Sequence, residues 1–161
     1  MSETLENNSM QPHYLSDSWA FWVHLPNDNN WDISGYKKLY NFNTAEHAIL
    51  FNEELGEQIF KHCMVFLMKN DIKPMWEDTN NKQGGCFSYK VSNKNIAKVW
   101  KKLFLLLIGK TISTQNIYKK INGITISPKK NFCILKIWLQ DCSEKNPSII
   151  QTIEGLNENG C

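Results

Sequence analysis

The amino-acid sequence predicts an α+β fold: a single antiparallel β-sheet with about three helices on one of its faces. Two observations support this prediction. Aromatic and β-branched segments typical of strands occur in runs that are interrupted by single helices. Three other segments carry apolar residues at helical spacing. The face of the sheet that the helices leave open must then be solvated or hold a ligand.

The strands are predicted from aromatic and β-branched segments that are bounded by turn residues. The first covers residues 19–25 and ends at a Pro-Asn-Asp turn, and the loop after it contains Trp31. The second covers residues 36–43 and is expected to place four side chains on one side: Tyr36, Lys38, Tyr40 and Phe42. Further strands are expected at residues 63–68, 86–91, 121–127 and 132–140.

The three helices are predicted from start signals followed by helical periodicity. Asn43 begins an N-cap signal, and the helix that follows extends to about Glu54. The main helix is expected between Asn93 and Lys110, where an apolar stripe faces away from four lysines. The third, residues 147–156, follows a proline start signal and carries Ile149, Ile150, Ile153 and Leu156 at helical spacing.

With 161 residues, of which 42% are hydrophobic, the chain suits one domain with a buried core. We expect that domain at residues 13–156, between a mobile tail at residues 1–12 and a short tail at 157–161. Residues 1–12 are polar and do not resemble an export signal, and no segment is long and apolar enough to cross a bilayer. We therefore expect a monomeric cytoplasmic or nuclear protein.

Composition excludes several classes of function. A formal charge of +2 argues against a protein that binds long duplex nucleic acid, although a short charged ligand remains compatible with it. All 18 basic residues are lysines, so a phosphate would be bound by ammonium groups. The five cysteines show no C-x-x-C spacing, which predicts reduced thiols and no zinc site. The histidines are scattered and Gly84-Gly85 lacks the rest of a phosphate loop, so we expect neither an enzyme nor a cofactor.

Two tryptophans in polar loops are the sharpest candidates for a binding site. Trp76 precedes Glu77 in a charged loop, and Trp31 is flanked by asparagines and an aspartate. Taken alone, a loop indole either contacts a ligand or folds back into the core, and Trp76 leaves both alternatives open. Two indoles can hold a flat cationic ring between them, with a cation–π contribution of about 0.5 to 2 kcal/mol per face. Glu77 could then accept hydrogen bonds from the N–H edge of a methylated guanine.

The other aromatic and basic candidates have simpler interpretations. Trp19, Trp22 and Trp100 have apolar neighbours and are expected in the core. Trp138 lies in a predicted strand, where core and contact roles both remain open. Taken alone, the pair Lys129-Lys130 is typical of a solvated hairpin tip, although it could also meet phosphates.

Taken in order, these residues resemble the eukaryotic translation initiation factor 4E family. The resemblance covers roughly residues 13–140, and its most specific part is the Pro-Met-Trp-Glu-Asp segment at 74–78 with its downstream Gly84-Gly85. The remaining matches are Trp19-x-x-Trp22, Trp31, Phe42-x-Thr44-x-Glu46, Trp100 and Leu105-x-Leu107-Ile108-Gly109.

The resemblance implies a cupped sheet, with helices on its convex back and the 7-methylguanosine cap of messenger RNA in its concave front. It maps the family's two stacking tryptophans onto Trp31 and Trp76, the base-reading glutamate onto Glu77, and the tryptophan that touches the methyl group onto Trp138. The family's phosphate-binding arginines fall at Cys86 and Ser127, and its phosphate-binding lysine falls near Ile134. We therefore expect phosphate contacts at Lys129, Lys130 or Lys136.

The helical back also departs from the family at the surface that docks a scaffold subunit. Ile49 replaces a tryptophan, Ala45 replaces a valine, and Lys101-Lys102 replaces a leucine-glutamate pair. Loss of an indole weakens a typical hot spot, and a lysine repels the basic residue that partners often present. The whole expected docking surface is His13, Tyr14, Leu15, Ala45, Ile49, Lys101, Lys102, Leu105 and Gly109.

The resemblance supports a cap-binding translation initiation factor whose scaffold partner carries an altered docking motif. An alternative is a repressor that occupies caps without recruiting the usual scaffold subunit. A third hypothesis is an interaction module that kept the fold and lost cap affinity. The chain stops near Leu156, where the family continues with further strands, so we expect a shortened member with fewer contacts beyond the cap.

Overall fold

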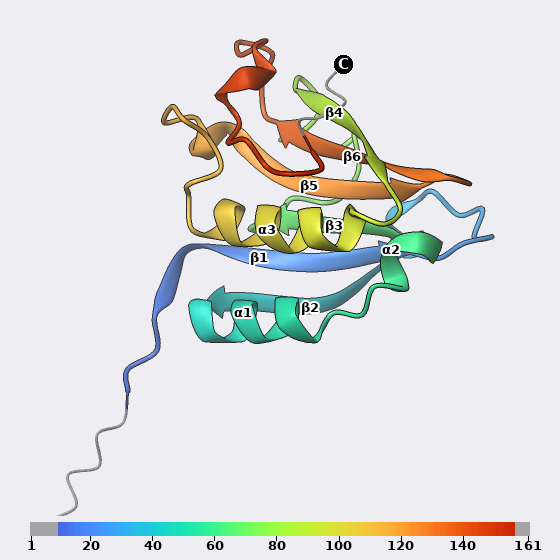
Figure 1. Cartoon of the computed structure of the whole chain (residues 1–161), viewed down its shortest axis with the longest axis horizontal. Coiled ribbons are helices and arrows are strands. Elements are labelled where there is room, and N and C mark those ends of the chain that lie inside the picture. The colour runs from blue at the N-terminus through green and yellow to red at the C-terminus, as the bar shows by residue number, and fades with distance from the viewer. Residues whose placement is uncertain (1–9, 157–161) are drawn as a thin grey trace, which may run out of the picture.

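Six antiparallel strands form one curved sheet in the order β2-β1-β3-β5-β6-β4 (Figure 1). This computed structural model describes residues 10–156. The predicted α+β class and antiparallel sheet are confirmed. The strands are β1 (Tyr14–His24), β2 (Tyr36–Thr44), β3 (Met64–Lys69), β4 (Gly85–Ser92), β5 (Ile121–Pro128) and β6 (Phe132–Leu139).

Helices α1 (Ala45–Glu54), α2 (Ile59–His62) and α3 (Ile96–Ile108) pack on one side of this sheet (Figure 1). We call that side the helix-covered face and the opposite side the open face. The N-cap signal before α1 is confirmed, because the Thr44 hydroxyl accepts a hydrogen bond from the backbone N–H of His47 at 3.4 Å. The described chain also contains 3₁₀ helices at Ile33–Gly35, Tyr118–Lys120 and Pro147–Ile149.

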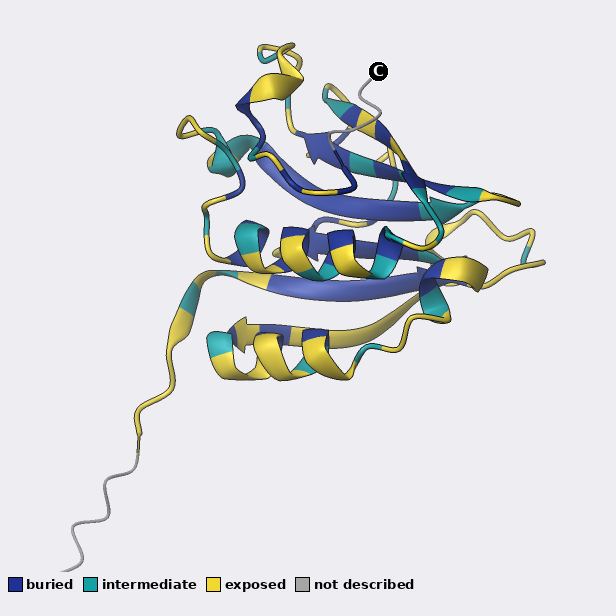
Figure 2. Cartoon of the chain, in the orientation of Figure 1, coloured by how far each residue is buried: buried dark blue, intermediate teal, exposed yellow. Residues whose placement is uncertain are grey.

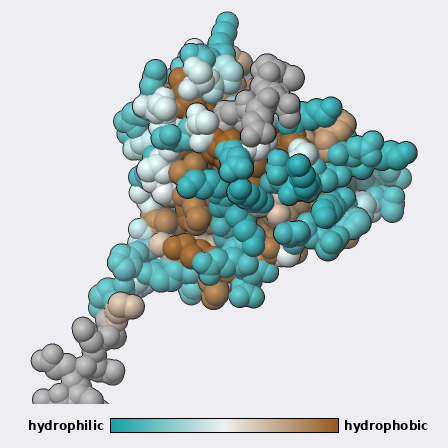
Figure 3. All heavy atoms as spheres, in the orientation of Figure 1, coloured by the Kyte–Doolittle hydropathy of each residue, from teal (hydrophilic) through white to brown (hydrophobic). Residues whose placement is uncertain are grey.

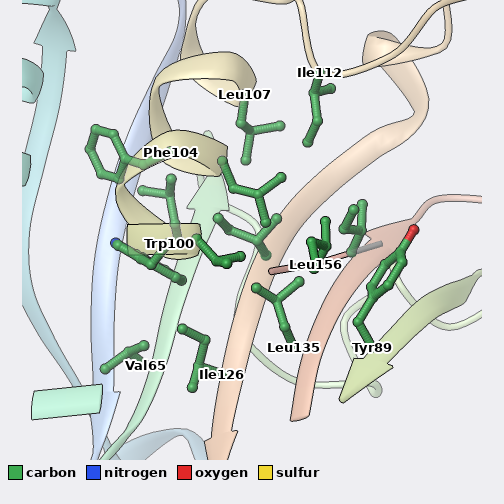
Figure 4. Packing of buried hydrophobic residues seen from close by; sticks show 14 of the residues in the cluster. Val65, Tyr89, Trp100, Phe104, Leu107, Ile112, Ile126, Leu135 and Leu156 are labelled. Atoms are coloured by element: carbon green, nitrogen blue, oxygen red, sulfur yellow. The ribbon is translucent and has the colours of Figure 1, made fainter. Parts of the chain in front are cut away.

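Strand alternation sends every second side chain into the core beneath the helices. In β6, Cys133, Leu135 and Ile137 belong to this core, and Figure 2 shows the central strands as largely buried. From α3, Trp100 and Phe104 point toward the strands and are fully buried (Figure 4). The predicted core positions of Trp19 and Trp100 are therefore confirmed.

A second, smaller cluster of buried side chains lies on the open face, built from the residues that alternate with the core. It consists of Ala20, Trp22, Phe66, Met68, Ile72 and Trp138. Trp22 is buried as expected, but in this cluster and not beneath the helices. Part of the open face is therefore apolar, and its side chains are buried although no helix covers them.

The prediction that the alternating residues of β2 share one side is wrong. Trp22 pairs with Lys38 and Phe21 pairs with Tyr40, so Leu39 is an extra residue that forms a bulge. A bulge shifts the later side chains to the other face. Tyr36 packs against the open-face cluster, whereas the rings of Tyr40 and Phe42 contact Phe51 beneath the helices.

The predicted third helix at residues 147–156 is also wrong, because only the 3₁₀ turn Pro147–Ile149 forms there. The backbone of this segment forms hydrogen bonds with a neighbouring loop. The Thr114 N–H donates to the Ile149 carbonyl at 2.6 Å, and the Gln151 N–H donates to the Ile112 carbonyl at 2.8 Å. The third helix of the fold is instead α2, which the sequence analysis did not predict. The four apolar residues are nevertheless buried: Ile149, Ile150, Ile153 and Leu156.

The predicted domain spans residues 13–156, and the structure describes residues 10–156. β1 begins at Tyr14, five residues before the predicted first strand. The predicted tails at residues 1–12 and 157–161 lie mostly outside the described residues. Within residues 10–156, no helix has the length and apolar character needed to cross a membrane.

The packing of α3 gives a stability prediction. Phe104 is fully buried and its ring contacts Phe42, Phe51 and Trp100. Because the replacement leaves a cavity, Phe104→Ala should lower the free energy of unfolding by about 3 to 5 kcal/mol in urea denaturation. Lys102→Ala, at an exposed position of the same helix, is the matched control and should change it by less than about 0.5 kcal/mol. Equal effects would mean that this face of α3 does not pack on the sheet.

Candidate functional site

A pocket of about 270 Å³ opens on the open face, between the loop after β1 and the loop after β3. Pockets of that size suit a single planar ring system better than a large ligand. The structure brings Trp31, Trp76, Glu77 and Trp138 together in its lining. The other lining residues are Tyr36, Met64, Phe66, Pro74 and Met75, and we call this cavity the base pocket.

Trp76 lies against Trp138, with ring centroids 4.2 Å apart and an interplanar angle of 4°. Trp138 is 4% exposed, and its Nε1 donates a hydrogen bond to the Thr125 hydroxyl at 3.2 Å. Trp76 remains 41% exposed, so it does not fill the core. Trp138 therefore serves as a fixed platform beneath a surface indole.

Buried amides hold the Trp76 loop in place. Asn81 is 1% exposed, and its Nδ2 donates to the carbonyls of Lys73 at 3.0 Å and Met75 at 2.8 Å. Asn122 of β5 donates to the Asn81 side-chain oxygen at 2.9 Å. At the end of the loop, a Cβ on Gly84 would lie 1.8 Å from the Leu139 carbonyl oxygen, so only glycine fits there.

A carboxylate closes the same loop. The backbone N–H of Lys73 donates to Asp78 at 2.9 Å, and the backbone N–H of Asn80 donates to it at 2.8 Å. Partial burial opposes ionisation, but these hydrogen bonds lower the pKa of Asp78 below its ordinary value. The ionised carboxylate thus stabilises the turn that presents Trp76 and Glu77.

Trp31 is backed by His24 in the same manner. The centroids of the two rings are 4.0 Å apart and the interplanar angle is 4°. His24 Nε2 donates a hydrogen bond to the Asn30 carbonyl at 2.8 Å. The Asn30 side chain accepts from the Asp32 N–H at 3.0 Å, and a Cβ on Gly35 would lie 1.9 Å from the Asn30 carbonyl oxygen. Trp31 is 55% exposed, so each loop indole has one face covered by a second ring and keeps much of its surface open to solvent.

Glu77 contributes negative charge beside these rings. Burial raises the pKa of Tyr36 above its ordinary value, and the charge of Glu77 raises it further. A neighbouring cavity of about 440 Å³ shares Glu77 and Met75 with the base pocket, but no aromatic ring lines it. Of these two neighbouring cavities, the base pocket is therefore the one that offers aromatic rings on which a planar cation can stack.

The three candidate phosphate lysines are not equivalent. Lys136 lies on β6 two residues before Trp138, on the same face, with Thr125 and Ser88 as its neighbours on the adjoining strands. Lys129 and Lys130 are exposed in the turn between β5 and β6, and neither of them lines the base pocket. Lys136 is thus the candidate that shares a strand and a face with a residue of the base pocket.

The residues of the expected docking surface lie on the helical side of the molecule, where Figure 3 shows apolar patches among polar ones. Ile49 is 42% exposed on α1, and Leu105 is 42% exposed on α3. Ala45 begins α1, Gly109 caps α3, and Leu15 packs against the edge of the core. Tyr14 is largely exposed, and Lys102 lies on the outer side of α3.

Two hydrogen-bonded connections shape this surface. His13 Nδ1 forms a hydrogen bond with the Glu46 carboxylate at 2.5 Å, and the Ala45 N–H donates to the His13 carbonyl at 2.8 Å. These two bonds connect the residue before β1 to α1. The Lys101 ammonium donates to the Glu53 carbonyl at 3.2 Å at the C-terminal end of α1. Lys101 therefore joins the two helices, and Lys102 is the lysine directed outward.

Four residues that line the base pocket or stack behind one of its indoles were not assigned to a site from the sequence. His24, Tyr36, Met64 and Phe66 all reach the open face through strand alternation. His24 lies two residues beyond Trp22 in β1, so the period of the strand could have indicated it. Within residues 10–156, no group of His, Cys, Asp and Glu side chains could hold a metal ion, and Cys63, Cys86, Cys133 and Cys142 are free thiols.

Comparison with known proteins gives the same answer as the resemblance. Residues 14–158 match the family model described as Eukaryotic initiation factor 4E. The chain is 28% identical over 136 residues to eukaryotic translation initiation factor 4E of Eremothecium gossypii, which covers 78% of this chain and 62% of that protein. It is 29% identical over 143 residues to the Candida albicans protein of the same name, and this match covers 82% of this chain and 66% of that protein.

A solved structure agrees with these relatives. The complex of C. elegans eIF4E-3 with the 4E-binding protein Mextli and cap analog superposes with a TM-score of 0.71 at 25% identity, over 83% of this chain and 77% of that one. The chain spans just under two thirds of the length of the two curated relatives. On the match to the family model, which covers most of its length, this chain belongs to the eukaryotic initiation factor 4E family.

Proposed function

We propose that this protein binds the 7-methylguanosine cap of messenger RNA and acts in translation initiation in the cytoplasm. The observation that carries the proposal is the base pocket, where the half-exposed Trp31 and Trp76 each rest on a second ring beside Glu77. Family membership supports it, as does the cap analog held by the C. elegans relative.

In the proposed complex, the methylated base stacks between the open faces of Trp31 and Trp76. Methylation at the imidazole ring makes guanine cationic, and indole faces attract cations by about 0.5 to 2 kcal/mol each. His24 and Trp138 stiffen the two walls, so less conformational entropy is lost when the base enters. Glu77 accepts hydrogen bonds from the N–H and amino group of the base. Trp138 stacks on the covered face of Trp76, so it can contact the added methyl group only if the Trp76 ring moves away from it.

The binding test is a titration of intrinsic tryptophan fluorescence with methylated and unmethylated guanosine triphosphate. Glu77→Ala should weaken binding of the methylated nucleotide by about 2 to 4 kcal/mol, because one carboxylate accepts two hydrogen bonds in a partly desolvated pocket. Glu57→Ala, at an exposed position between α1 and α2, is the control and should change nothing. A loss of less than tenfold for Glu77→Ala would contradict its base-reading role.

The charge of Glu77 can be tested without ligand. The pKa of Tyr36 is raised by burial and by Glu77, so Glu77→Gln should lower it toward its ordinary value without fully restoring it. Carbon NMR of labelled tyrosine, followed through an alkaline titration, measures this shift. Glu57→Gln is the matched control, and an unchanged Tyr36 pKa in Glu77→Gln would place the carboxylate away from the base pocket.

For the phosphates, we propose contacts from Lys136, with Lys129 and Lys130 reaching in from the turn. Lys136 shares the open face with Trp138 and takes part in none of the three ion pairs found among the described residues. Ammonium groups bind phosphate as point charges, so they tolerate the loss of the family's arginine geometry.

We also propose that α1 and α3 dock an amphipathic helix that carries a carboxylate opposite Lys102. Ile49 and Leu105 supply the exposed apolar part of this surface, and Lys102 supplies the charge. Lys101 is already bonded to the end of α1 and contributes less. The family relative bound to Mextli supports a protein partner for this chain.

Fluorescence anisotropy with two labelled peptides tests this docking. An ordinary 4E-binding peptide with a basic residue opposite Lys102 should bind more weakly than the same peptide with glutamate there, because like charges repel. The double change Ile49→Trp and Lys102→Glu should reverse that preference. Lys98→Glu, on the same helix, is the control for net charge. Equal binding of both peptides to the natural protein would contradict the altered motif.

The absence of an indole at Ile49 also favours a second candidate, a repressor that occupies caps without recruiting a scaffold. An extract depleted of its own cap-binding factor separates the two functions. Restored translation of a capped reporter supports the initiation factor, and further inhibition supports the repressor.

A further inference from the structure

Phe132 is an aromatic residue that belongs to neither of the two buried clusters. It begins β6 and is partly exposed. Cys133, Leu135 and Ile137 point into the core, so alternation places Phe132 on the open face with Trp138. Its ring therefore lies on the side of the sheet that carries the base pocket.

Two lysines lie between Phe132 and the base pocket. In the regular β4–β6 pairing, Trp138 faces Cys86, Lys136 faces Ser88, and Ile134 faces Lys90. We call Lys136, Ser88, Ile134, Lys90 and Phe132 the β4–β6 strip. At about 3.4 Å per residue, Lys136 lies about 7 Å and Phe132 about 20 Å from Trp138 along the strand.

The charges of the strip are available to a ligand. Lys90 Nζ lies 4.4 Å from the centroid of the Phe132 ring, and neither Lys90 nor Lys136 belongs to any of the three ion pairs of the described chain. A cation over an exposed ring is held more weakly than one bonded to a phosphate. Lys90 can therefore exchange the ring for a phosphate and uncover Phe132.

We propose that the β4–β6 strip binds the RNA nucleotide that follows the cap. This inference rests on the proposed cap binding and extends the same site. The phosphate bridge lies over Lys136 and Lys90, and the next base stacks on Phe132. The strip extends about 20 Å from Trp138, which stacks behind Trp76, and this length suits a triphosphate followed by a nucleoside, with cations at intermediate positions and an aromatic ring at the far end.

An RNA strand fits this strip better than a protein segment does. Charged groups along a track with a partly exposed ring are the combination that binds single strands, because every base has a face that can stack. Ser88 adds a hydroxyl between the two lysines, at an exposed position of the edge strand β4. Stacking carries no base code, so the site should accept any first nucleotide.

The experiment compares two ligands on the full chain: 7-methylguanosine triphosphate and the capped dinucleotide m7GpppA. Phe132→Leu should weaken the dinucleotide about tenfold, because base stacking is lost, and should change the mononucleotide less than twofold. Phe132→Tyr keeps a stacking face and should bind both ligands like the natural protein. Lys90→Gln should weaken the dinucleotide and lower the slope of its salt dependence by about one ion.

Lys94→Gln, at an exposed lysine in the turn before α3, is the matched control and should change neither ligand. If Phe132→Leu changes both affinities by one factor, or changes neither, the strip does not hold the second nucleotide. If the natural protein fails to bind either ligand, cap binding itself is wrong and this inference falls with it. Thermal unfolding of each variant separates lost binding from lost structure, and Lys90→Gln tests the strip independently of the ring.

Discussion

The contact between Trp76 and Trp138 is the interaction on which the site depends. Trp138 is anchored in β6 and bonded to Thr125, so its plane is set by the sheet. Trp76 comes from a loop that is held by the buried Asn81 and Asn122 amides. A surface indole would otherwise lose much rotational freedom on binding a ligand, and the stack removes most of that cost in advance.

The opposite wall of the base pocket is also supported by a second ring. His24 lies at the end of β1 and stacks on one face of Trp31. The loop that carries Trp31 is held by hydrogen bonds to the carbonyl and the side chain of Asn30. Both walls therefore combine an exposed ring from a loop with a second ring from a strand. The sheet acts as the rigid part of the site, and the loops carry the chemistry.

Much of this organisation was predictable from local signals, but some of it was not. Trp31, Trp76 and Glu77 were identified from unburied indoles in polar loops and from the family resemblance, and the structure brings all three to one pocket. The bulge at Leu39 left no clear mark in the sequence, so the sides of Tyr36 and Tyr40 were assigned together in error. The segment at 147–156 has helical spacing, yet its backbone bonds to the loop at 112–114.

The sequence by itself determined the class of fold, the positions of the strands and of helices α1 and α3, and the residue types that a planar cation would need. These follow from periodicity and from side-chain chemistry, which are local properties. Only the tertiary structure decided which rings back each other, which lysine shares a face with the pocket, and that Lys101 joins two helices while Lys102 faces outward. Such relations depend on strand register and long-range packing, and no short stretch of sequence contains them.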